Sequence, residues 1–167
     1  REMWAAWESD YHLNINLQMN YWPADVCNLS NTYKPLSDYI YRLAERGKIT
    51  ANKFTGSEGW MAHHATNIFG RTTPSGSNKA SQVNNGYSFP LAGAWMSLSL
   101  WRHYQFTKNN EYLEKTVYPV IKGASQFILD FLVENEKGEL VTAPSYSPEN
   151  AYINPKTGKA IRNTVAA

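Results

Sequence analysis

Residues 91–106 read LAGAWMSLSLWRHYQF, and this stretch decides the fold class. It is rich in Ala, Leu, Trp and Ser, and it carries no acidic or basic side chain before Arg102. A helix that is apolar nearly all round is expected to be buried on most of its faces. After a short connection, residues 111–133 place apolar side chains at spacings of three and four, as an amphipathic helix does. Pro119 should kink or split this second helix, because it removes one backbone hydrogen bond.

The same alternation occurs earlier in the chain. A helix is predicted over Leu17–Leu29, and an amphipathic one over Leu36–Phe54, where Pro35 suits the first turn. Gly56 then ends the second helix. Buried and amphipathic helices in turn are typical of a barrel of inner and outer helices, although an ordinary helical bundle fits the pattern equally well. The sequence therefore predicts an all-α class.

Two long segments outside these helices are expected to be irregular. The first, from Gly56 to Pro90, is full of Gly, Ser, Thr and Asn, and the second runs from Asn135 to the end. Structureless segments longer than about 15 residues in a compact domain usually carry function. We expect them to gather at one end of the helices and to hold the functional residues.

The composition narrows the functional class. The chain has 167 residues, of which 43% are hydrophobic and 18% charged, which is typical of one globular domain. With 16 basic and 14 acidic residues, the charge gives no argument for nucleic acid or an anionic membrane. No apolar run of about 18 residues predicts a membrane span. The single cysteine, Cys27, cannot form a disulfide within the chain or a Cys-based metal site.

Aromatic residues make up 14% of the chain, with 6 Trp and 11 Tyr. Their flat faces suit the C–H faces of sugar rings, but they also fill large cores, and composition alone favours the core. The chain opens with Arg1 and ends in mid-pattern at Ala167, from which we expect residues 1–167 to be a single incomplete segment of a larger domain.

Asn14 and Asn16 precede the first predicted helix. In an extended lead-in, residues two apart point the same way, and each amide offers a donor and an acceptor to a water or a sugar hydroxyl. Asn also caps helices well, and the pair by itself favours capping.

His63 and His64 lie in the loop GWMAHHATN, residues 59–67. Adjacent histidines have the wrong spacing for two metal ligands on one helix face, and no Glu-x-x-His motif or Cys cluster accompanies them. We therefore predict no metal and no cofactor. Hydrogen bonding to a sugar and anchoring of the loop both remain open for these histidines.

Glu149 lies in the stretch SYSPEN, residues 145–150. A carboxyl group flanked by Pro and aromatic residues can have a raised pKa, as a general acid needs. An exposed loop Glu, or the first turn of a helix, explains the same pattern, and the sequence logic alone favours those simpler readings.

Four strings together resemble glycoside hydrolase family 95, the inverting α-L-fucosidases: LNINLQMNYWP (13–23), GWMAHH (59–64), GAW (93–95) and PSYSPEN (144–150). The resemblance implies an (α/α)6 barrel of inner and outer helices, of which the predicted helices are about the first two hairpins. It implies hydrolysis of terminal α-1,2-linked L-fucose with inversion, on a fucosylated glycan. Members acting on α-L-galactosides, and a non-catalytic carbohydrate-binding relative, are the alternatives. Since fucosylated glycans are extracellular, the resemblance places the parent protein in the periplasm or outside the cell.

The resemblance also implies roles for individual residues. Glu149 matches the general acid, while Asn14 and Asn16 match the pair that orients the attacking water. The segment containing His63, His64 and Trp60 resembles the loop that holds the sugar. An Asp completes the water-activating group in the family, and no matching segment occurs here. Because an Asn amide cannot take up a proton near neutral pH, the 167-residue segment alone is expected to be inactive.

Overall fold

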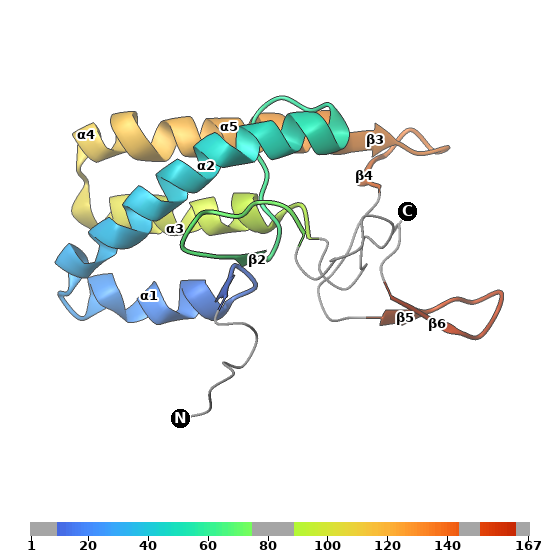
Figure 1. Ribbon diagram of the computed structural model, residues 1–167, viewed down its shortest axis with the longest axis horizontal. Coiled ribbons are helices and arrows are strands. Elements are labelled where there is room, and N and C mark those ends of the chain that lie inside the picture. The colour runs from blue at the N-terminus through green and yellow to red at the C-terminus, as the bar shows by residue number, and fades with distance from the viewer. Residues whose placement is uncertain (1–9, 75–88, 144–150, 163–167) are drawn as a thin grey trace.

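The computed structural model describes residues 10–74, 89–143 and 151–162, and this part of the chain is mostly helical (Figure 1). The helices are α1 (Asn16–Val26), the 3-10 helix η2 (Ser30–Tyr33), α2 (Lys34–Thr55), α3 (Ala92–Thr107), α4 (Asn110–Tyr112), the π-helical η4 (Leu113–Val117) and α5 (Tyr118–Phe131). The strands are β1 (Tyr11–His12), β2 (Ala65–Thr66), β3 (Leu132–Glu134), β4 (Leu140–Thr142), β5 (Ala151–Ile153) and β6 (Ala160–Arg162). The helical character of the prediction is confirmed.

The helix ends follow from local chemistry. The first helix stops at Val26, earlier than predicted, and Asn28 then takes a left-handed conformation with φ 59°, which Asn tolerates better than most residues. The helix α2 ends at Gly56, whose φ of 71° suits glycine. The predicted fourth helix is divided as expected: the π-helical turn η4 directly precedes α5, which has Pro119 in its first turn.

Short antiparallel strand pairs occur within and beside the segments predicted to be irregular. The strand β1 pairs with β2, β3 with β4, and β5 with β6. The prediction of irregular structure is therefore wrong for β2, β4, β5 and β6, and the predicted fourth helix gives way to β3 at its end. Two- and three-residue strands carry too little periodicity to be read from sequence, because their pairing depends on distant partners.

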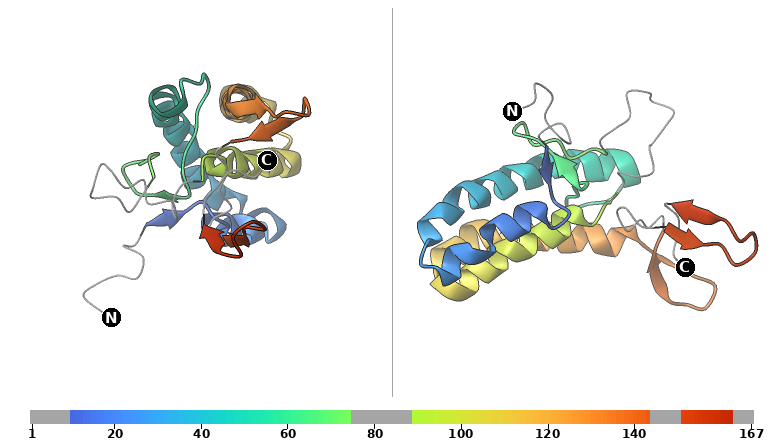
Figure 2. Two further views of the ribbon diagram at one scale, coloured as in Figure 1. Left: turned by 90° about the vertical axis from the view of Figure 1, so that its right-hand side faces the viewer. Right: turned by 90° about the horizontal axis from the view of Figure 1, so that it is seen from below.

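The longer helices form two layers. Helices α1 and α3 contact each other, α2 contacts α5, and α3 contacts both α2 and α5. Seen end-on, α5 and the C-terminal part of α2 lie above α3, and α1 lies below it (Figure 2). The helices α1 and α3 run in the same direction, so their N-terminal ends face the same end of the molecule (Figure 1).

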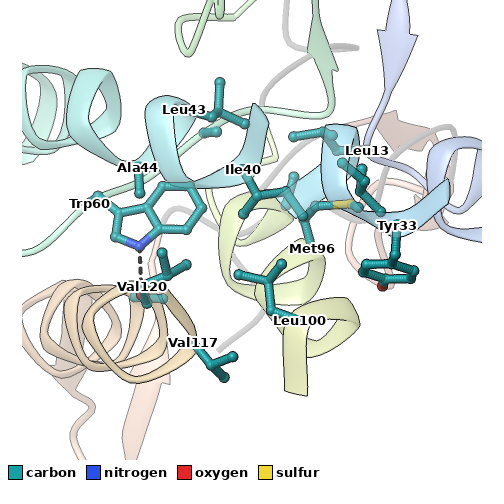
Figure 3. Close-up of a cluster of buried hydrophobic side chains, with 14 of the residues drawn as sticks. Leu13, Tyr33, Ile40, Leu43, Ala44, Trp60, Met96, Leu100, Val117 and Val120 are labelled. Atoms are coloured by element: carbon teal, nitrogen blue, oxygen red, sulfur yellow. Dashed lines mark hydrogen bonds between the residues drawn. The ribbon is translucent and has the colours of Figure 1, made fainter. Parts of the chain in front are cut away.

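The core lies between these layers and contains Ile40, Leu43, Met96 and Leu100 (Figure 3). The expectation that residues 91–106 are buried on most faces holds only for one face of α3. Met96 and Leu100 are fully buried, whereas Leu98 and Trp101 are exposed.

Trp60 joins three helices at the centre of this core. Its indole N–H donates to the carbonyl oxygen of Val120 at 2.8 Å (Figure 3). A Cβ added to Gly47, Gly93 or Gly123 would lie within 3 Å of the Trp60 side chain. These glycines belong to α2, α3 and α5, so together they form the slot that accepts the ring.

Candidate active site

The first strand pair brings two of the predicted site segments together. Tyr11 pairs with Thr66 and His12 with Ala65, and the backbone N–H of Leu13 donates to the carbonyl of His64 at 2.5 Å. Both strands lie beside the N-terminal end of α1 (Figures 1 and 2). The asparagine segment and the histidine loop, about fifty residues apart in sequence, are therefore neighbours in space.

Asn14 and Asn16 flank a turn and not the extended lead-in that we predicted. Ile15 is the N-cap residue of α1, with φ 72° and ψ −35°, and Asn16 is the first residue of the helix. The capping explanation for the pair is not supported, because the N-cap position belongs to Ile15, which has no polar side chain. Asn14 is half-buried and Asn16 is exposed.

His63 is a buried anchor. The side chain is 1% exposed, and its Nδ1 accepts a hydrogen bond from the backbone N–H of Phe89 at 2.9 Å. Since Nδ1 accepts, the proton of the neutral ring is on Nε2. Burial, and secondarily the charge of neighbouring His64, lowers the pKa of His63 to about 3. The ring therefore stays neutral at physiological pH and ties the loop to the start of α3.

This burial makes stability depend on pH. Because the folded-state pKa is lowered from 6.5 to about 3, the neutral ring contributes stability that is complete above pH 6.5 and is lost as the pH falls toward 3. We expect His63→Asn, whose Oδ1 can still accept from Phe89, to flatten the fall in thermal midpoint of the complete protein between about pH 7 and 4. Parallel curves for the variant and the wild type would contradict this assignment.

Trp60 is placed differently from our expectation. We predicted that it contacts the substrate, but the side chain is 1% exposed, and its N–H is bonded to Val120. An indole enclosed in this way has no free face for a sugar ring. The structure gives Trp60 a packing role beneath the histidine loop.

His64 and His12 bring two imidazoles to the same strand pair. His64 is buried, His12 is half-buried, and their ring centroids lie 6.1 Å apart in an edge-to-face arrangement. We did not select His12 from the sequence, because only the pairing of β1 with β2 reveals its neighbour.

Two further contacts, also missed by the sequence analysis, fix the loop after β2. The hydroxyl of Tyr39 bonds to the Thr66 hydroxyl and donates to the Asn67 carbonyl, both at 2.7 Å. Burial raises the pKa of Tyr39 to about 12, so it remains a neutral donor. The helix α2, which carries Tyr39, therefore holds the strand pair from one side. Arg71 and Asp10 form an ion pair across the same strands.

A hollow of about 610 Å³ lies on the flank of the site, between α1 and α2. Tyr11, Tyr21 and Tyr39 line it, together with apolar side chains of both helices. Tyr11 belongs to β1, so the hollow adjoins the site, but neither Asn14 nor Asn16 lines it. We do not assign it to the reacting sugar.

Glu149 belongs to residues 144–150, outside the residues that the structure describes. The pairs β3–β4 and β5–β6 stand on either side of that segment in the sequence. In the described ranges no group of three or more His, Cys, Asp or Glu side chains is arranged to hold a metal ion. Nor is any helix in these ranges long and apolar enough to cross a bilayer.

Comparisons with known proteins all point to one family of glycosyl hydrolases. The family model for the glycosyl hydrolase family 95 catalytic domain matches residues 1–167. Alpha-L-fucosidase 2 of Arabidopsis thaliana is 37% identical over 155 residues, covering 93% of this chain and 18% of the relative. Probable alpha-fucosidase A of Aspergillus niger is 39% identical over 158 residues, covering 91% of this chain and 19% of the relative. The chain thus spans about a fifth of the length of these relatives.

Proposed function

The chain belongs to glycosyl hydrolase family 95, and from this premise we propose that the complete protein cleaves terminal α-1,2-linked L-fucose from glycans with inversion at the anomeric carbon. Two relatives that carry the name α-fucosidase support a fucoside as the substrate. The structural observation that carries the proposal is the pairing of β1 with β2, which sets Asn14 beside the histidine loop.

Each residue then has a chemical task. Glu149 would protonate the departing glycosidic oxygen, while Asn14 and Asn16 would hold the attacking water on the opposite face of the sugar. Inverting enzymes keep their acid and base about 6.5–9.5 Å apart to leave room for that water. Asn cannot accept the proton of the water, so a carboxylate elsewhere in the complete protein must serve as the base. Without it, the 167-residue segment is expected to be inactive.

The histidine loop would face the sugar from the side of β2. His64 is paired through its backbone to Leu13, next to Asn14, and is the histidine that we place closest to the substrate. His63 and Trp60 would act beneath it, since both are buried and hydrogen-bonded within the chain.

We further propose that these helices are part of an (α/α)6 barrel, with α1 and α3 inside and α2 and α5 outside. Contacts within each layer and between α3 and the outer helices support this arrangement. An exposed apolar stripe along α1 adds to this support. It consists of Met19, Trp22 and Val26, at spacings of three and four, and such a stripe is expected where further helices of the barrel pack. Because fucosylated glycans lie outside cells, we expect the complete protein in the periplasm or outside the cell.

The test of substrate class is release of free sugar by the complete protein from 2′-fucosyllactose and from the matching α-L-galactoside, which differ only at C6. We expect the fucoside to give the higher kcat/KM. A higher value for the galactoside would move the assignment to an α-L-galactosidase of the same family. Binding of both without release would favour a non-catalytic carbohydrate-binding protein.

A further inference from the structure

The backbone just before Asn14 is clamped on both sides. Leu13 is fully buried, its N–H donates to the His64 carbonyl, and its own carbonyl accepts from Nε2 of Gln18 at 2.9 Å. Gln18 is in the first turn of α1 and is itself only 3% exposed. Both polar groups of the Leu13 backbone are thus held by fixed partners.

The backbone just after Asn14 is strained. Ile15 has φ 72° and ψ −35°, a positive φ that is a genuine outlier for a β-branched residue. Its carbonyl accepts from the N–H of Met19 at 2.8 Å, which ties the turn to the helix. Such conformations persist only where surrounding contacts impose them, and they gather at functional sites.

Gln18 buries an amide oxygen that has no hydrogen-bond partner among the described residues, and we infer that its amide does more than fill space. A carbonyl can only accept, so the amide nitrogen must face Leu13, and Oε1 points away from it. Among the residues that the structure describes, this buried Oε1 has no hydrogen-bond partner. A Met side chain would fill a similar volume without the unpaired Oε1, but it would leave the buried Leu13 carbonyl without this donor. The amide is therefore present for the bond to Leu13.

We propose that Gln18 is a positioning residue that holds the Leu13 carbonyl and, with the strained Ile15, sets the direction in which Asn14 and Asn16 meet the attacking water. The proposal rests on the proposed function, since it acts through the two asparagines. Without the clamp, the turn can relax toward an ordinary backbone conformation, and both amides then lose their fixed orientation.

The test compares Gln18→Met and Gln18→Glu in the complete protein, with Gln105→Met and Gln105→Glu on the exposed side of α3 as controls. We expect Gln18→Met to lower kcat on 2′-fucosyllactose about tenfold with KM nearly unchanged, as loss of one orienting hydrogen bond would. The thermal midpoint should change little, because removal of the unpaired Oε1 offsets the loss of the donor to the Leu13 carbonyl. In Gln18→Glu, the ratio of its kcat to that of the wild type should rise as the pH falls. A protonated carboxyl offers Leu13 an O–H in place of the amide N–H, and burial favours the protonated form.

Ile15→Gly is the companion variant, because glycine accepts a positive φ without strain. We expect it to lower kcat while leaving the thermal midpoint unchanged or higher. Wild-type kcat in Gln18→Met would overturn the proposal. The proposal would also be overturned if the thermal midpoint of Gln18→Met fell enough to account for its lost activity and the relative kcat of Gln18→Glu did not rise at low pH.

Hydrogen exchange of peptides covering residues 13–16 separates this proposal from the proposed function. Faster exchange there in Gln18→Met, at unchanged global stability, shows the clamp whether or not a fucoside is cleaved. Inactive wild-type protein with that local change would overturn the proposed function alone, whereas unchanged exchange would overturn the clamp.

Discussion

Replacing Glu149 by Gln in the complete protein is expected to lower kcat on 2′-fucosyllactose by about 10²–10⁴-fold, the range that general acid catalysis typically contributes. Gln keeps the size of the side chain but has no proton to give, so the departing sugar oxygen must leave as an alkoxide. A fucoside with a good leaving group, such as nitrophenyl, needs less help from an acid and should lose much less.

Comparing the two substrates separates an acid from a merely structural residue, because misfolding would reduce both rates alike. Glu136→Gln is the matched control, since Glu136 is exposed in the turn between β3 and β4. It should retain wild-type rates. Equal losses on both substrates, or full activity of Glu149→Gln, would refute the acid assignment.

Trp60→Ala is expected to have the largest effect on stability, about 3–5 kcal/mol, the usual cost of truncating a buried aromatic side chain. The change empties the slot between Gly47, Gly93 and Gly123 and removes the indole hydrogen bond to the Val120 carbonyl. Neighbouring backbone can relax only partly into such a space, since all three helices are fixed by other contacts. Thermal unfolding of the complete protein measures the loss.

Two variants divide this effect into its parts. Trp60→Phe keeps most of the ring but removes the N–H. It should cost about 0.5–1.5 kcal/mol through the loss of this one hydrogen bond, since the Val120 carbonyl keeps its acceptor role within α5. Gly93→Ala keeps Trp60 but places a Cβ 2.6 Å from its Cζ3, and should cost about 1–3 kcal/mol through overpacking. Tyr118→Ala on the exposed side of α5 is the control. A Trp60→Ala midpoint no lower than that of the control would contradict the central packing of Trp60.

The helices could be predicted because they depend on periodic patterns within each segment. Apolar spacing located α2, and an uncharged run rich in Ala, Leu, Trp and Ser located α3, each to within a few residues. Pro119 predicted the interruption at η4. The pairing of β1 with β2 could not be predicted in this way, because two residues carry no periodic signal and the pairing depends on a partner loop fifty residues away.

The candidate site shows the same division between local and distant determinants. Asn14 and Asn16 were selected from sequence, but nothing local predicts a positive φ at a β-branched residue such as Ile15, which the contacts of Leu13 and Gln18 support. Trp60 was assigned to the substrate because its segment resembles the loop that holds the sugar in the family, whereas the structure buries it. The signal that would have corrected it is spread over three helices, in the glycines that meet its ring.

The central claim is that the complete protein is an inverting α-L-fucosidase, and proton NMR of 2′-fucosyllactose during the first minutes of hydrolysis tests it most directly. With inversion, the anomeric signal of β-L-fucose appears first, and the α-anomer grows later by mutarotation. First appearance of α-L-fucose would show retention and contradict the mechanism, and no release of fucose by freshly prepared protein would contradict the function itself.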